Sequence, residues 1–322
     1  MDARWWVMVG VVMLGTLAVM LARRFLLPAR ARSVGVAPRR VLVGDILDEE
    51  MNAPLLDGYL NALARPLGAA DAMGVRRWGE GRTALSKVDP SQVLSLRNAL
   101  PRFLRVAYEI EDPWRAYTTE SRTYMENDGL QKMARFMEEV WQTDERRHAA
   151  VFRASYLKLT GLDDVTPNPM TVEQVGTGEG AFERHLYQRL LAELSASSAY
   201  SVFAMHACGP LHLSLRNVAG DEFRHLAVFW AALKWRFGDV MPIRLAKAAR
   251  WGLALGLEQQ NRSGADAVGL EDAIMTAEIG AAMAASTLRL LWWDRTLTAG
   301  RLREVFGPPP RVSTSTMVDL SA

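Results

Sequence analysis

The chain of 322 residues contains a single cysteine, Cys208. One thiol can form neither a disulfide framework nor a thiolate zinc finger, and so few cysteines are typical of a reducing compartment. A metal site in this chain would therefore be built from histidines and carboxylates.

The chain also lacks an excess of either charge, because 38 basic residues nearly balance 36 acidic ones. This balance gives no electrostatic basis for a nucleic-acid partner, and we expect none. Hydrophobic residues make up 49% of the chain and charged residues 23%. Such a mixture excludes a disordered chain, a collagen-like fibre and a multi-span membrane protein.

Alternation of apolar and polar residues, which is typical of strands, is lacking over any stretch long enough to build a sheet. Apolar residues instead recur at helical spacing through most of residues 91–307. The sequence therefore predicts an all-α fold, with one main helical domain over 91–307.

The N-terminus carries an uncharged apolar run of 18 residues from Trp5 to Ala22, just long enough to cross a bilayer as a helix. A cleaved signal peptide is the alternative, but its basic residues would precede the run. We therefore expect a single-pass membrane anchor over residues 1–28, with everything from about residue 29 onward in the cytoplasm. The basic residues that follow the run are Arg23, Arg24, Arg30, Arg32, Arg39 and Arg40.

Two further segments flank the main domain. Residues 29–90 are rich in proline, glycine, alanine and arginine, which predicts a linker with short helices packed on the main domain. Residues 308–322 begin with three prolines and predict a flexible tail.

An internal repeat carries the chemistry. Residues 144–152 are DERRHAAVF and residues 221–229 are DEFRHLAVF, identical at seven of nine positions. Each contains Glu-x-x-His, which places a carboxylate and an imidazole about one turn apart on one helix face. A single such pair is usually a surface contact, but both pairs lie on apolar faces and point into the core. The sequence thus predicts Glu145, His148, Glu222 and His225 as metal ligands.

A dinuclear site between four helices needs one more glutamate from each of two other helices. Glu193 lies on the apolar face of its helix, and Glu111 lies on that of an upstream helix. Glu109 falls on the opposite face, but it stays an alternative because Pro113 can shift the local register. Glu111 precedes Glu145 by 34 residues and Glu193 precedes Glu222 by 29, as expected for antiparallel helices joined by short loops.

Charge gives the physical reason for a metal pair. Four carboxylates buried together repel one another, and they must take up protons or bind cations. Two divalent ions would balance them, and a carboxylate-rich set with two imidazoles suits iron or manganese better than zinc or copper. Asp144 and Asp221 precede the ligand glutamates. We expect each to accept the free ring N–H of a ligand histidine from another helix.

The remaining histidines and the arginines of the repeat have simpler interpretations. No ligand spacing pairs His185, His206 or His212, so we expect ordinary polar contacts for them. Arg147 and Arg224 are expected to form structural salt bridges.

The chain resembles the ferritin-like di-iron carboxylate superfamily, and within it the soluble acyl-acyl-carrier-protein desaturases. The similar sequence segments are WQTDERRH at 141–148, YLKLTG at 156–161 and DEFRH at 221–225. The surroundings of Glu111 and Glu193 match more loosely, and the resemblance covers roughly residues 95–240. The chain departs from this family in its predicted anchor and in a shorter connection between the third and fourth ligand helices.

The resemblance implies a ferritin-like four-helix bundle with additional helices, to which the apolar run adds the expected N-terminal transmembrane helix. It implies two iron ions, O2 as co-substrate and a ferredoxin-type electron donor. The substrate would be a fatty acyl or lipid-like chain, carried on acyl carrier protein or taken from the membrane, and a homodimer is expected by analogy. The ligand set carried over is Glu111, Glu145, His148, Glu193, Glu222 and His225.

Several other functions stay open on the sequence. A di-iron hydroxylase or oxygenase could act on a quinone, carotenoid or porphyrin-like metabolite. Ferritin-like or rubrerythrin-like handling of iron or peroxide is a second alternative, although one cysteine cannot build a thiolate iron centre. A ribonucleotide-reductase-like radical subunit would carry tyrosine where this chain has Phe152. An anchored scaffold with a structural metal is the non-enzymatic alternative.

Overall fold

The computed structural model describes residues 42–64, 96, 98–166, 180–238, 240–262 and 270–308, with the backbone alone for 253–262 and 270. The regular elements of these residues are all helices, which confirms the all-α class. The expected anchor over 1–28, and the expected tail over 308–322 except its first residue, lie outside the described residues. The helices are α2 Val43–Glu50, α3 Ala53–Leu63, α5 Ala99–Glu111, α6 Trp114–Asn127, α7 Gln131–Phe136, the π-helical turn η3 Met137–Trp141, α8 Gln142–Thr160, α9 Ala181–Met205, α10 Gly209–Phe237, α11 Met241–Arg262, α12 Leu270–Asp294 and α13 Ala299–Phe306.

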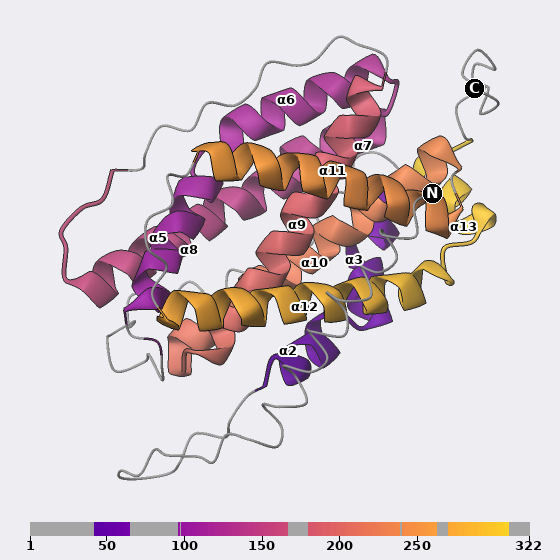
Figure 1. Cartoon of the computed structure of the whole chain (residues 1–322). Coiled ribbons are helices and arrows are strands. Elements are labelled where there is room, and N and C mark those ends of the chain that lie inside the picture. The colour runs from indigo at the N-terminus through magenta and orange to yellow at the C-terminus, as the bar shows by residue number, and fades with distance from the viewer. Residues whose placement is uncertain are drawn as a thin grey trace.

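Two helical hairpins form the centre of the molecule (Figure 1). In the first, α5 and α6 follow one another across a break at Pro113, whose ring cannot continue a helix without strain. The chain turns back at 128–130, and α7, η3 and α8 then run on as one long helix that packs on α5 and α6. In the second hairpin, the short connection 206–208 lets α9 and α10 pack along each other. The hairpins meet where α8 contacts α10.

Glycine ends two of the long helices. Gly161 after α8 has φ 72° and Gly238 after α10 has φ 64°. Both angles lie in the left-handed region, where a side chain is strained and glycine is not. The start of α3 is capped by Asn52, whose side chain accepts a hydrogen bond from the backbone N–H of Leu55 at 3.1 Å.

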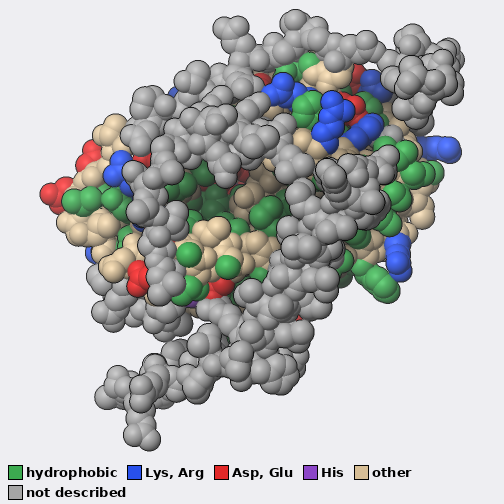
Figure 2. All heavy atoms as spheres, in the orientation of Figure 1, with side chains coloured by type: hydrophobic (Ala, Val, Ile, Leu, Met, Phe, Trp, Pro, Cys, Tyr) green, Lys and Arg blue, Asp and Glu red, His purple; other side chains and the backbone are tan. Residues whose placement is uncertain are grey.

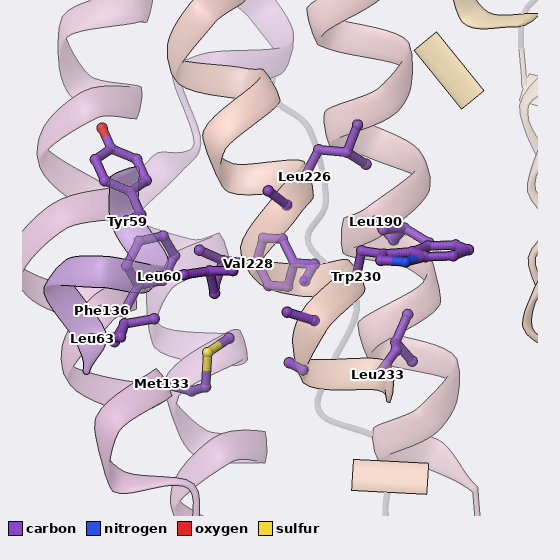
Figure 3. Packing of buried hydrophobic residues seen from close by; sticks show 14 of the residues in the cluster. Tyr59, Leu60, Leu63, Met133, Phe136, Leu190, Leu226, Val228, Trp230 and Leu233 are labelled. Atoms are coloured by element: carbon purple, nitrogen blue, oxygen red, sulfur yellow. The ribbon is translucent and has the colours of Figure 1, made fainter. Parts of the chain in front are cut away.

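The apolar core consists of two clusters that follow one another along the hairpins. The first joins α3, α7 and α13 to one half of α9 and α10. Figure 3 shows part of it, with Leu60 and Leu63 of α3 and Phe136 of α7 facing Val228 of α10. The second cluster joins α5, α8 and α12 to the other half of α9 and α10, through residues such as Phe152.

The C-terminal helices cover the second hairpin. A buried network fixes the end of α12: Asp294 accepts hydrogen bonds from Trp230 Nε1 and Arg244 Nη2, both at 2.7 Å. It also pairs with Lys234 at 3.1 Å. One carboxylate thus joins α12 to α10 and α11.

One described helix, Glu271–Asp294, is long and apolar enough to cross a membrane by length and composition alone, and 33% of its most apolar window is buried. The core helix of a soluble protein would satisfy the same criterion, so this is weak support for a membrane association. Leu288 and Trp292 on this helix are 53% and 70% exposed. Figure 2 shows hydrophobic side chains, with a few acidic ones, over part of the face where α12 lies.

Candidate metal centre

The six predicted ligands form a polar layer between the two apolar clusters. On the α7–α8 helix the layer lies between Trp141 of the first cluster and Ala149 of the second. On α10 it begins just beyond Ala219 of the second cluster. Each of the six side chains belongs to a residue that is at most 5% exposed. The helices therefore bring these polar groups into a region that is closed to water on both sides.

The six side chains form two groups that share two members. Glu111, Glu145, His148 and Glu222 offer one ligand atom each within 4.8 Å of one another, and so do Glu145, Glu193, Glu222 and His225. Glu145 and Glu222 belong to both groups. This arrangement could hold two metal ions, with the two shared carboxylates between them.

The histidine nitrogens point into the cluster in a way that suits a metal. His225 Nδ1 lies 3.1 Å from Glu222 and 3.3 Å from both Glu145 and Glu193. One ring N–H cannot donate to three carboxylates from three helices at once. A cation at this convergence point would instead use all of these oxygens and the ring nitrogen together. His148 Nδ1 likewise lies 2.8 Å from Glu222 Oε1.

Two carboxylate oxygens of the shared pair give a second indication. Glu145 Oε1 and Glu222 Oε1 are buried and accept no hydrogen bond of acceptable geometry. Buried carboxylate oxygens normally have a donor or a metal as partner. The donor set therefore fits a pair of divalent ions.

The outer nitrogens of the two histidines are held by the aspartates of the repeat, in a crossed arrangement. His225 Nε2 lies 3.3 Å from Asp144 of α8, and His148 Nε2 lies 3.5 Å from Asp221 of α10. Each aspartate thus contacts the histidine of the other repeat copy, as the sequence predicted. In a neutral ring, an aspartate beside Nε2 favours the N–H on Nε2, which would leave Nδ1 for a metal.

Three aromatic side chains that the sequence did not single out for the site also contact it. Tyr200 of α9 donates its phenol proton to Glu111, and Trp141 Nε1 donates to Glu193 at 2.9 Å. Tyr59 of α3 donates to Asp144 at 2.5 Å. Burial, with added repulsion from nearby carboxylates, raises the pKa of the Tyr59 and Tyr200 phenols well above its usual value. Both phenols therefore remain protonated donors.

The structure also separates the two candidates for the first glutamate. Glu111 ends α5 and is buried in the cluster. Glu109 instead forms an ion pair with Arg105 one turn away, at 3.0 Å. The helix face predicted from periodicity is therefore kept up to Glu111, because α5 breaks only after it.

The other histidines and the repeat arginines have the structural contacts expected of them. His185 Nε2 lies 3.0 Å from Ser121 and its ring stacks on Tyr124. Arg147 and Arg224 pair with the aspartates of their own helices, Asp144 and Asp221. The remaining two contacts join His206 to Glu278 and His212 to the carbonyl oxygen of Ala204.

Without cations the cluster balances its charge with protons. Burial, followed by the charge of Glu145, raises the pKa of Glu111 well above its usual value, and burial with the charge of Glu222 does the same to Glu193. Burial alone would also raise the pKa of Glu145, but a hydrogen bond with Glu111, followed by contacts with the two imidazoles, lowers it. Burial and the charge of Glu145 would raise the pKa of Glu222, but contacts with the two imidazoles lower it. Burial alone would lower the pKa of His148 and His225, and their carboxylate contacts raise it well above the usual value.

A scan against protein-family models, a search of the curated proteins and a search of the solved structures each found no match to this chain. The helical fold and the buried cluster are compatible with a ferritin-like protein. They define the class of site, a buried carboxylate–histidine cluster that could bind metal.

The shared and unshared glutamates should differ in how many ions they retain. Glu145→Gln or Glu222→Gln should lose both ions, because each removes charge from both groups, whereas Glu111→Gln or Glu193→Gln should lose one. Metal content per chain after anaerobic loading with Fe2+ and gel filtration tests this order. Equal metal loss in all four variants would contradict the two-group arrangement.

Metal binding should release protons. Two divalent ions would displace protons from Glu111 and Glu193, whose pKa is raised, and from the two imidazoles, whose pKa is also raised. Apparent affinity should therefore rise with pH and fall as the solution becomes more acidic. Calorimetric titration with Mn2+ in buffers of different ionisation enthalpy measures the protons released. An observed heat independent of the buffer would contradict this expectation.

Proposed function

We propose that the protein is a di-iron, O2-dependent oxidoreductase of the desaturase-like type that acts on a hydrophobic substrate. The observation that carries this proposal is the pair of buried ligand groups that share Glu145 and Glu222. Its support from the sequence is the similarity of the repeat words to those of the acyl-acyl-carrier-protein desaturases. We include in the proposal a ferritin-like four-helix bundle formed by the two hairpins.

The residues divide between the two ions. Glu111 and His148 would hold one ion, and Glu193 and His225 the other, with Glu145 and Glu222 between them. Iron fits because carboxylates and imidazoles are ligands that Fe(II) accepts. Manganese is accepted by the same set, and the experiment below distinguishes the two metals.

A bound pair of irons would supply the redox chemistry with O2 needed to break an unactivated C–H bond. The substrate –CH2–CH2– group, O2, two electrons and two protons would give –CH=CH– and two molecules of water. Hydroxylation would use the same inputs on one C–H bond and give an alcohol and one water. The electrons would come from a one-electron iron–sulfur donor of the ferredoxin type.

The chain's own residues would fix the ligands and keep the site dry. Tyr200 and Trp141 orient the two unshared glutamates through hydrogen bonds, and the aspartates orient the imidazoles. Apolar clusters on both sides of the polar layer exclude water and suit a hydrocarbon better than a polar metabolite. The predicted N-terminal anchor would place such a site next to membrane lipids.

The function is tested on the full chain in detergent or lipid nanodiscs, after expression in medium enriched in a Mössbauer-active iron isotope. We expect close to two irons per chain, with Mössbauer spectra of a spin-coupled pair. With ferredoxin, its reductase, NADPH and O2, fatty acyl or lipid substrates should lose two hydrogens or gain one oxygen, as detected by mass spectrometry. The Glu145→Ala/Glu222→Ala double variant, purified alongside, should contain no iron and yield no product.

Three outcomes would contradict the proposal. Folded protein that binds no iron after anaerobic loading would remove the metal pair, and manganese retained in preference to iron would remove the di-iron assignment. Two irons with rapid peroxide turnover and no organic product would instead assign the protein to iron or peroxide handling.

A further inference from the structure

Tyr59 contacts the metal centre from outside the four ligand-bearing segments. It lies on α3, which packs on α10, and only 4% of it is exposed. Its phenol donates to Asp144 Oδ2 at 2.5 Å, and its ring stacks on His225 with centroids 5.6 Å apart and planes 23° apart. Tyr59 therefore contacts both members of one crossed aspartate–histidine pair.

The second crossed pair, Asp221 with His148, has a different hydrogen-bond donor behind its aspartate. Asp221, which faces His148, takes a hydrogen bond from Arg224 of its own helix. Asp144 also has an arginine of its own helix nearby, but Arg147 Nη1 is 3.5 Å away. Although the two repeat copies are nearly identical in sequence, α3 contributes a hydroxyl donor to Asp144.

The aromatic surroundings follow the same asymmetry. Phe136 and Trp141 lie near the His225 ring with centroid distances of 6.1 and 6.3 Å, in addition to Tyr59. The guanidinium of Arg224 lies 5.6 Å from the Tyr59 ring centroid. The Tyr59 ring is thus fixed between a cation and an imidazole, and its hydroxyl is directed at a single carboxylate.

We propose that Tyr59 is a positioning residue that fixes Asp144 and, through it, the His225 ring, so that the two metal positions are not equivalent. The position formed with Glu193 and His225 contacts Tyr59 directly, whereas the position formed with Glu111 and His148 is linked to Tyr59 through Arg224 and Asp221. This inference rests on the metal pair of the proposed function. Loss of a hydrogen-bonding partner behind a ligand histidine typically weakens metal binding ten- to a hundredfold.

Tyr59→Phe separates positioning from packing, because phenylalanine keeps the ring stack and removes only the hydroxyl. Anaerobic titration with Co2+ reports both affinity, through the binding isotherm, and ligand geometry, through the visible absorption bands. We expect Tyr59→Phe to weaken one of two binding steps about tenfold, and to weaken the other step and shift its absorption much less. Tyr124→Phe on α6, whose ring stacks on His185, is the matched control and should leave both steps unchanged.

Two backgrounds assign the affected position. In Glu111→Gln the position with Glu193 and His225 remains, and adding Tyr59→Phe should weaken it. In Glu193→Gln the position with Glu111 and His148 remains, and adding Tyr59→Phe should weaken it less. Tyr200→Phe removes the donor to Glu111 and should show the opposite pattern in the two backgrounds.

The outcomes separate this inference from the proposed function. A wild-type chain that binds no metal overturns both. Two metals bound by the wild type, with Tyr59→Phe weakening neither step or both steps equally, overturn the positioning role and leave the metal pair intact. Thermal unfolding of the metal-free variants accompanies each titration; an affinity loss that tracks the unfolding temperature in every background would show a structural role and overturn the inference.

Discussion

The mutual repulsion of four buried glutamates governs this structure. Glu111, Glu145, Glu193 and Glu222 come from four helices into a layer closed to water. Such a group is stable only when protons or cations neutralise it. Without metal, the compensating protons are held by the unshared glutamates, Glu111 and Glu193, and by the two imidazoles, because the pKa of each of these groups is raised. Two divalent ions could replace these protons, so the layer could bind metal.

The fold forms this layer because nearly the same nine-residue sequence occurs on one helix of each hairpin, α8 and α10. Because Asp, Glu and His stand at fixed positions of a turn, each copy presents a ligand pair inward and an aspartate toward the other copy's histidine. The crossed contacts join α8 to α10 at the point where the hairpins meet. The π-helical turn just before α8 ends at Trp141, whose indole contacts Glu193. The remaining elements then distinguish the two halves, since Tyr59 of α3 donates to Asp144 and stacks on His225 of one crossed pair.

Helical periodicity was sufficient to predict the all-α class. It favoured Glu111 and left Glu109 open, and the structure places Glu111 in the cluster because α5 stays regular up to its last residue. The repeat predicted the two Glu-x-x-His pairs, and the structure brings them together with Glu111 and Glu193. The sequence could not predict that Tyr59 contacts the cluster, since residues 29–90 show weak periodicity. The contacts of Tyr59 depend on how α3 packs on α10. It also could not predict the π-helical turn, because that depends on tertiary packing against the neighbouring helices. The anchor over 1–28 lies outside the described residues and stays a prediction.

The central claim is that two ions lie between the hairpins and share Glu145 and Glu222. Anomalous diffraction from crystals of the iron-loaded protein, collected on both sides of the iron absorption edge, tests it most directly. The account predicts two anomalous peaks, one beside Glu111 and His148 and one beside Glu193 and His225, with the shared carboxylates between them. Iron-loaded crystals with a single peak, or with peaks only on the molecular surface and direct hydrogen bonds within the carboxylate layer, would contradict it.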